Sequence, residues 1–220
     1  RADGDVGAHG GVEGDHGGKQ VFLGSPEWRR NFVTSVVNLI TSYPAFAGIH
    51  VNVEPVPTGN GDFVKLLAEL RRALPQDAIL SVAAYPPPTV LHPFPRVHWQ
   101  EGYFKVVAQE VDQMVIMMYD TGLRIQKPYI HLISTWTKEA LTWAGHTDVL
   151  LGLPVYEGKG ARHHFSRVEN LQNALSGVHR GLTDLKVMPP AYGGIALYSE
   201  WEMDSSEWAY LRGNFLNRRR

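Results

Sequence analysis

Residues 46–55 place side chains that can move protons at alternate positions along the chain. The polar residues His50, Asn52 and Glu54 alternate with β-branched apolar residues. A period of two residues predicts a strand with one polar and one apolar face. Pro55 predicts the end of that strand, because proline has no backbone N–H to donate to a sheet. Carboxyl and imidazole groups are common proton carriers in enzymes, so the polar face is the first candidate site.

The flanking sequence indicates how these side chains are positioned. Phe32, Val36 and Ile40 form a helical stripe before the strand, and a second helical pattern follows it over residues 60–74. Alternating strands and helices predict a parallel sheet that helices cover. In a closed parallel barrel, one face of each strand meets the helices and the other points into the barrel. The polar face would then point inward, with its carboxyl group at the rim where barrel enzymes keep their chemistry.

The rest of the chain continues this alternation. Further strands are expected over residues 20–24, 78–84, 111–119, 149–156 and 193–198. Helices are expected from Ser25–Pro26, from about 60, over about 100–109 and 129–143, from a capping box at 166–169, and over about 205–216. These make about six βα units, whereas a (β/α)8 barrel has eight. The predicted fold is therefore an α/β fold of the TIM-barrel type that lacks about the first two βα units. Either the chain is a fragment or the barrel is incomplete. A flavodoxin-like open sheet is the alternative, although no phosphate loop is present.

Composition limits the class of protein. The chain has 220 residues, of which 44% are hydrophobic and 20% are charged, with a formal net charge of -1. This is ordinary for one globular core, and it gives no general attraction to nucleic acid or to an anionic membrane. No apolar run approaches the ~20 residues of a membrane span. The absence of cysteine excludes disulfides and thiolate metal sites, and no signal peptide is visible in a chain that begins with Arg1.

Two domain-level expectations follow. Residues 1–19 are rich in Gly, Asp and His and are interpreted as a flexible segment, and residues 20–220 as the partial barrel domain. His9 and His16 show no metal-ligand spacing, so neither a metal nor a cofactor is expected. The basic residues 218–220 are expected to be solvated.

Four segments in order resemble glycoside hydrolase family 18, the chitinase-like barrels. The fourth strand of that family reads Asp-Gly-x-Asp-x-Asp-x-Glu, and residues 47–54 read Ala-Gly-Ile-His-Val-Asn-Val-Glu. Residues 117–120, Met-Met-Tyr-Asp, are similar to the end of its sixth strand, and residues 152–156, Gly-Leu-Pro-Val-Tyr, to its seventh. Gly193–Gly194 leads to Tyr198 where the eighth strand of the family ends in Trp. The sequence of residues 53–88 also resembles the spore-cortex and cell-wall branch of this family.

The resemblance implies substrate-assisted retaining hydrolysis of β-1,4-linked N-acetylglucosamine polymers, either chitin or peptidoglycan, a mechanism that dispenses with a second carboxyl nucleophile. Glu54 would protonate the leaving oxygen, while the acetamido oxygen of the substrate attacks the anomeric carbon. The residue two positions earlier, here Asn52, would orient the acetamide, and Tyr119 would hydrogen-bond its oxygen. His50, Asp120, Tyr156, Tyr198 and Trp201 are the candidate substrate-binding residues, with His50 expected to lie deepest as a core histidine bonded to Asn52 or to a neighbouring strand.

The chain departs from the family pattern at three acidic positions, because Ala47, His50 and Asn52 replace aspartates. A neutral Asn52 cannot offer a charge to the cationic intermediate, which would cost ~2–4 kcal/mol of transition-state stabilisation. The enzyme is therefore slow or inactive, or a second carboxylate compensates: Asp120 first, then Glu157 or Glu200.

Three functions therefore stay open. The first is the hydrolase, the second is a non-catalytic glycan-binding protein on the same barrel, and the third is a glycosidase that pairs Glu54 with Glu157 or Glu200. All three have an oligosaccharide or polysaccharide as the partner. A secreted or cell-envelope location is the expectation, and the oligomeric state is left open.

Overall fold

The computed structural model describes residues 8–9, 22–158 and 163–216. The sequence expectations for residues 10–19, including the metal question at His16, and for the basic residues 218–220 lie outside these ranges. No helix within the described ranges is long and apolar enough to cross a membrane.

Five parallel strands form the main sheet, in the spatial order β2-β4-β5-β6-β7. Their bounds are β2 Gly48–Val51, β4 Ile79–Ala84, β5 Gln113–Met117, β6 Asp148–Pro154 and β7 Tyr192–Tyr198. Two short strands, β1 Ala8–His9 and β3 Val53–Glu54, pair beside it. Each strand of the main sheet pairs with the next one along the chain, without the reversal of order that defines a doubly wound sheet. The predicted barrel-type α/β fold is confirmed, and the flavodoxin-like alternative is wrong.

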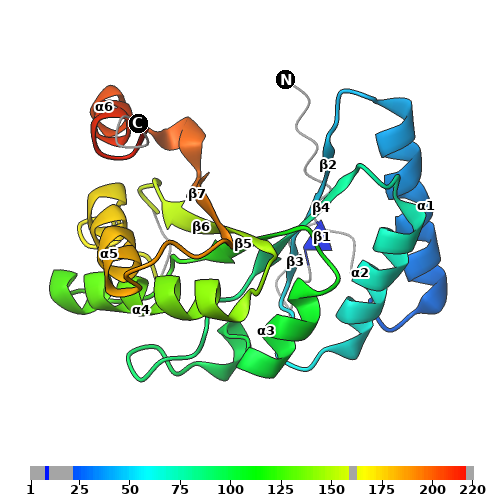
Figure 1. The fold of residues 1–220 in the computed structure, drawn as a ribbon, viewed down its shortest axis with the longest axis horizontal. Coiled ribbons are helices and arrows are strands. Elements are labelled where there is room, and N and C mark those ends of the chain that lie inside the picture. The colour runs from blue at the N-terminus through cyan, green and yellow to red at the C-terminus, as the bar shows by residue number, and fades with distance from the viewer. Residues whose placement is uncertain (1–7, 10–21, 159–162, 217–220) are drawn as a thin grey trace.

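Helices connect these strands and form an arc along one side of the sheet, from α1 and α2 through α3 to α4 and α5 (Figure 1). Their bounds are α1 Pro26–Ser42, α2 Gly61–Ala73, α3 Glu101–Ala108, α4 Gln126–Trp143, α5 Leu171–Asp184 and α6 Ser205–Asn214. Two single turns, η1 Pro95–Val97 and η2 Glu200–Glu202, lie in loops after β4 and β7. Right-handed crossovers place every helix on the same side of the sheet when each new strand is added at the same edge. The opposite face of the sheet is left as a concave inner face.

The two faces of the strands divide as the alternating sequence predicts. On the helix side, Leu80, Met114 and Leu151 of the three central strands are fully buried. They pack in one core with Phe63 and Leu66 of α2. On β2 the helix-side residues are likewise buried, and the polar side chains of that segment face the inner side. The apolar face of the central segment therefore fixes where its polar face points.

Local capping signals set most of the helix starts. The Ser25 hydroxyl accepts a hydrogen bond from the Trp28 N–H at 3.2 Å, and the Asn60 side chain accepts from Asp62 and Phe63. Both helix starts were predicted from these residues. Satisfying the unpaired N–H groups of the first turn typically contributes about 1 kcal/mol.

Two sequence expectations in this layer are wrong. Residues 22–24 form a turn rather than the end of a strand, because the Ser25 N–H must fold back to the Phe22 carbonyl at 2.9 Å before α1 begins. The capping box at 166–169 does not form. Asn170 caps α5 instead, by accepting from the Asn173 N–H, and the side chain of Glu169 is buried elsewhere.

The inner face is open beside β2, the edge strand of the main sheet. His50 was expected to lie deepest, yet it is exposed, because no described strand lies beyond β2 to cover it. Its predicted bond to a neighbouring strand is confirmed: Nδ1 lies 2.9 Å from the Ser81 hydroxyl, which donates to Gln113 Oε1 at 3.1 Å. The sheet is thus an incomplete barrel whose inner polar side chains meet solvent at one edge.

Candidate functional site

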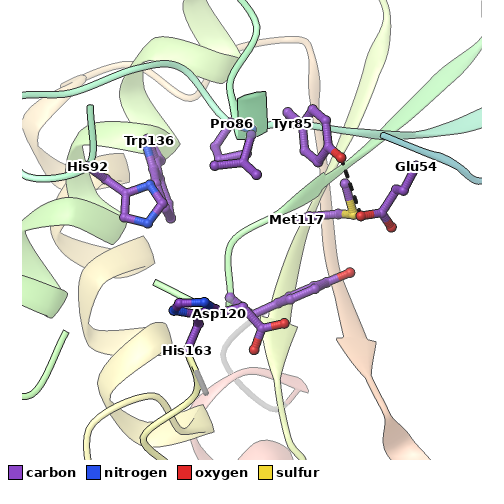
Figure 2. A pocket seen from close by; sticks show the side chains of 10 residues that line it. Glu54, Tyr85, Pro86, His92, Met117, Asp120, Trp136 and His163 are labelled. Atoms are coloured by element: carbon purple, nitrogen blue, oxygen red, sulfur yellow. Dashed lines mark hydrogen bonds between the residues drawn. The ribbon is translucent and has the colours of Figure 1, made fainter. Parts of the chain in front are cut away.

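A pocket of about 280 Å³ lies at the carboxyl ends of β3, β4 and β5. The carboxyl end of a parallel sheet is the usual position of active sites in barrel folds. Figure 2 shows Glu54 and Tyr85 on one side of this pocket and His92 and Trp136 on the other. Its lining residues are Glu54, Tyr85, Pro86, His92, Val97, Met117, Tyr119, Asp120, Trp136 and His163.

Glu54 and Tyr85 form the side of the pocket nearest the open edge. The Tyr85 hydroxyl donates to Glu54 Oε2 over 3.5 Å, a long and weak hydrogen bond. Burial, and then the Glu54 carboxylate, raise the pKa of Tyr85, so the hydroxyl keeps its proton near neutral pH. The Tyr85 ring packs edge-on against buried Trp99, whose indole N–H donates to the Val56 carbonyl. Glu54 therefore has a fixed neighbour but only one loose contact of its own.

The opposite wall is uncharged. His92 Nδ1 lies 2.7 Å from His98 Nε2, and His98 Nδ1 donates to the Pro86 carbonyl at 2.9 Å. Burial, and then His98, lower the pKa of His92 to about 4, and burial lowers the pKa of His98. The Trp136 indole N–H is committed to the Pro87 carbonyl. This wall consists of buried aromatic rings packed against one another and carries no positive charge.

Three tyrosines pack together at the ends of β5, β6 and β7. Tyr119 stacks on Tyr198 with ring centroids 4.9 Å apart and an interplanar angle of 15°. Tyr156 meets Tyr198 edge-on at 5.4 Å. Burial, and then the nearby Glu54, raise the pKa of Tyr119, whose hydroxyl is therefore a donor at neutral pH. Tyr198 is 49% exposed, so one face of this cluster is open to a ligand.

Asp120 brings a second carboxylate into the pocket, directly after Tyr119. Its backbone lies in the left-handed region, with φ 55, which turns the side chain away from the direction of β5. Burial alone would raise its pKa, but contacts with His164 and with the Tyr156 hydroxyl, which donates to Asp120 Oδ1, lower it below the ordinary value of 3.8. Asp120 is therefore a pocket carboxylate that neighbours on its far side hold in place.

The structure brings together some of the sequence-predicted site residues and separates others. Glu54, Tyr119 and Asp120 line the pocket. Tyr156 and Tyr198 do not line it, but they contact Tyr119 and Asp120 from behind. Within the described residues, the buried Oδ1 of Asn52 has no hydrogen-bond partner, and Asn52 lies between β2 and β3 rather than on the pocket wall.

Other candidates lie away from the pocket. His50 sits on the exposed inner face, and Trp201 in η2 is 74% exposed. Glu157 and Glu200 are exposed and do not line the pocket either. The second carboxylate beside Glu54 in this structure is Asp120.

Sequence reasoning missed several pocket residues. Tyr85 had a signal, since it follows a predicted strand and precedes a proline-rich rim loop, as Glu54 precedes Pro55. His92 had none, because a loop brings it to the pocket only through tertiary packing, whereas Trp136 was considered for a glycan groove but interpreted as a core residue. Among the described residues, no group of three or more His, Asp or Glu side chains has the arrangement of a metal site.

The fold is that of the chitinase-like barrels. The chain is similar to a class V chitinase from Pseudomonas fluorescens, with a TM-score of 0.63, 16% identity, and coverage of 87% of this chain and 73% of that one. A chitinase from Chromobacterium violaceum gives a TM-score of 0.58 at 18% identity over 86% of this chain and 72% of that one. The spore cortex-lytic enzyme SleL from Bacillus cereus gives 0.58 at 17% identity over 88% of this chain.

The chain spans only 55% of the length of that cortex-lytic enzyme. No family model and no curated protein sequence matches it. At these identities the likeness is one of fold, and it accounts for the parallel order of strands and for the position of the pocket at their carboxyl ends.

Proposed function

We propose that this chain is a glycoside hydrolase that acts on β-1,4-linked N-acetylglucosamine polymers, with Glu54 as the general acid. The observation that carries the proposal is the meeting of Glu54, Tyr119 and Asp120 in one pocket, although the first and the last are far apart in the sequence. The pocket volume of about 280 Å³ lies near the lower limit of ~300 Å³ for small-molecule sites. It has room for about one sugar ring.

The proposed mechanism needs only one carboxyl group to transfer protons. Glu54 gives its proton to the glycosidic oxygen, which leaves with the rest of the polymer. The acetamido oxygen of the same sugar attacks the anomeric carbon, forming a cyclic oxazolinium ion. Water then opens this ion while Glu54 takes back a proton, so the anomeric configuration is retained. The Tyr119 hydroxyl, which stays protonated, donates to the acetamide oxygen.

Asp120 supplies the negative charge that the neutral Asn52 lacks. An oxazolinium ion is positive, and a carboxylate fixed at the pocket wall favours it electrostatically without having to reorganise. The lowered pKa of Asp120 keeps it ionised while Glu54 cycles between its two protonation states. The amide oxygen of Asn52 is buried, has no partner among the described residues and lies off the pocket wall, so Asn52 is not assigned a contact with the acetamide.

The names of the structural neighbours support the substrate class. Two are chitinases and one is a spore cortex-lytic enzyme. Both descriptions are consistent with a sugar that carries an N-acetyl group, which this mechanism requires. Chitooligosaccharides and peptidoglycan are therefore the two substrates to test.

The decisive test is the release of reducing ends from both substrates by the whole chain and by Glu54→Gln. Glutamine keeps the shape of the side chain but has no proton to give, so we expect a fall of about 10²–10⁴-fold. Glu157→Gln, which changes an exposed carboxylate outside the pocket, is the matched control and should hydrolyse at the wild-type rate. Equal rates for Glu54→Gln and the wild type would remove Glu54 from the mechanism.

A second candidate is a glycan-binding protein without turnover, which the neutral Asn52 favours. It predicts that calorimetry detects oligosaccharide binding while no reducing ends appear under any condition. Binding in that case depends on the tyrosine cluster rather than on Glu54. Turnover that is lost with Glu54 excludes this candidate.

A further inference from the structure

A buried ion cluster lies directly behind the Asp120 wall of the pocket. It consists of Asp120 after β5, His164 in the loop after β6, and Glu169 just before α5. His164 Nδ1 is 3.5 Å from Asp120 Oδ1 and 3.8 Å from Glu169 Oε2. The side chains of His164 and Glu169 have no exposed surface, whereas the side chain of Asp120 is 49% exposed. The cluster thus connects a sealed interior to the pocket.

The hydrogen bonds of the imidazole determine its charge. His164 Nε2 lies 3.0 Å from the Tyr156 carbonyl oxygen, which can only accept, so Nε2 carries a proton. In the neutral ring Nδ1 would then be a lone pair. That buried atom has no hydrogen-bond partner among the described residues and faces the two carboxylates. A lone pair against two acceptors is repulsive, whereas a second N–H is attractive, so the arrangement fits the imidazolium form.

Glu169 fixes the chain segment that carries Asp120. Its two carboxylate oxygens accept hydrogen bonds from the backbone N–H groups of Thr121 at 2.9 Å and Gly122 at 3.1 Å. These are the two residues after Asp120, whose own φ of 55 sets the direction of its side chain. The same carboxylate therefore faces the imidazole and restrains the backbone next to the pocket.

The imidazole is also held by packing. Its ring stacks on Tyr156, with centroids 4.1 Å apart and an interplanar angle of 23°, and the hydroxyl of that tyrosine donates to Asp120. Gly158, with φ +60, also lies close to the imidazole, because a Cβ added there would be 2.5 Å from His164 Cδ2. Tyr156 and Gly158 therefore both restrict the position of the ring.

We propose that His164 is a positioning residue, whose imidazolium form aims the Asp120 carboxylate and the Tyr156 hydroxyl at the pocket. This inference rests on the proposed hydrolase function for its effect on turnover. When His164 loses its charge, Asp120 loses the ion pair on its far side and no longer has one fixed direction. His164 does not touch the sugar in this account; it acts through Asp120.

The carboxylates that face His164 favour the charged form of its imidazole. Burial alone would lower the pKa of His164, but Asp120 and Glu169 raise it above its ordinary value of 6.5. Burial raises the pKa of Glu169, opposed by the Thr121 N–H and His164. The other titratable neighbours are His163, Tyr129 and Tyr156. The charge of His163 acts on Asp120. Burial raises the pKa values of Tyr129 and Tyr156, and Glu169 also raises both of them.

The first test needs no substrate. In the full chain labelled with ¹⁵N-histidine, the two ring nitrogens of His164 are followed by NMR as the pH is raised. We expect both to keep the shifts of a doubly protonated ring to a pH clearly above 6.5, the ordinary value for histidine. His164→Gln identifies the signal by its loss. A midpoint at or below 6.5 would overturn the proposal, whether or not the chain hydrolyses glycans.

The second test separates positioning from mere support of the fold. His164→Gln removes the charge, and a misdirected group in a site costs up to about 10²-fold, so we expect kcat to fall by about 10–100-fold with little change in KM. The alkaline decline caused by deprotonation of the general acid Glu54 should remain, and the further decline that follows the NMR midpoint of His164 should be absent from this variant. His146→Gln, an exposed change in the turn between α4 and β6, is the control.

Gly158→Ala gives an intermediate case, because it displaces the ring without removing its charge. It should lower kcat less than His164→Gln and keep the further alkaline decline. An unchanged kcat in His164→Gln, or the same pH profile as the wild type, contradicts the proposal. If the wild type hydrolyses nothing, the proposed function fails, and the NMR titration alone decides the state of His164.

Discussion

The two carboxylates of the pocket are supported in opposite ways. Glu54 lies on β3, and among the described residues its side chain has one long hydrogen bond, from Tyr85 at 3.5 Å. Asp120 lies against a sealed cluster, with Tyr156 and His164 on its far side and Glu169 behind them. A group that must give and regain a proton gains from loose contacts, whereas a group that stabilises a charge gains from fixed ones. The contrast fits the two roles that are proposed for these carboxylates.

The same contrast separates a region where substitutions should cost little stability from a region where they should cost more. Near Glu54, side chains meet solvent, so a substitution can be accommodated by water. Around Glu169, the buried Thr121 N–H donates to this one side chain, while the Gly122 N–H is shared between Glu169 and the His163 carbonyl. Each group left unsatisfied costs about 1–3 kcal/mol. The predictions below test this difference.

The largest expected effect is on stability, in Glu169→Ala. Losing the acceptor of the buried Thr121 N–H should reduce the free energy of unfolding by about 3 kcal/mol, because Gly122 keeps the His163 carbonyl as an acceptor. At about 2–4 °C per kcal/mol for a chain of this size, the melting temperature should fall by roughly 10 °C. Glu54→Ala, measured in parallel by thermal and denaturant unfolding, should lose less than about 1 kcal/mol. Equal losses at the two positions would end the comparison.

The next effect is on rate, in Asn52→Asp. This change adds a carboxylate on the Glu54 side and so makes the open region resemble the Asp120 side. If a fixed charge in this site contributes about 2–4 kcal/mol, hydrolysis of chitooligosaccharides should speed up by about 100-fold. Asn38→Asp, an exposed change on α1, is the control. No gain in initial rate would mean that Asp120 already provides all the useful charge.

A smaller loss of rate is expected for Tyr85→Phe. The phenol is the donor that meets the carboxylate left on Glu54 after it gives up its proton. Since the hydrogen bond is long, its removal should cost about 1 kcal/mol, which is a roughly five-fold lower kcat. Steady-state kinetics on one defined oligosaccharide would show it. A loss as large as that of Glu54→Gln would show that Tyr85 itself transfers the proton.

The smallest effect is a pH dependence of stability through Asp120. Its folded-state pKa lies below the ordinary value of 3.8, so its contribution is present above pH 3.8 and is lost as the pH falls through the folded-state value. Because the side chain is 49% exposed, this contribution should stay below about 1 kcal/mol. Asp120→Asn should therefore be slightly less stable than the wild type at pH 6, and the difference should vanish in strong acid, as measured by urea unfolding. A difference that grows in acid would reverse the assigned sign.

The sequence was informative wherever one short segment determined its own structure. The alternation around His50 predicted which side chains face inward, and Ser25 and Asn60 predicted two helix starts. Strand ends predicted the meeting of Glu54 with Tyr119 and Asp120, since parallel strands end at one edge. In each case the physical cause lies within a few residues.

The sequence was uninformative where distant segments decided the outcome. Glu169 matches a capping box locally, but its carboxylate is captured by the backbone after β5, 48 residues earlier in the chain. His50 was expected to be buried, because an inward position in a closed barrel would bury it, and the missing cover beside β2 leaves it exposed. Local pattern can identify a polar side chain with a role, but only packing shows which partner it finds.

The order of the main sheet has a consequence for how the chain acquires its structure. Every strand from β4 to β7 pairs with the preceding strand of the main sheet, so each new unit can dock on an edge that has already been synthesised. Contacts between successive units close short loops, which favours rapid assembly from the amino end onward. The pocket is then completed in stages. Glu54 is placed early, and Asp120 is held in place only when the segment before α5, which carries His164 and Glu169, has been synthesised.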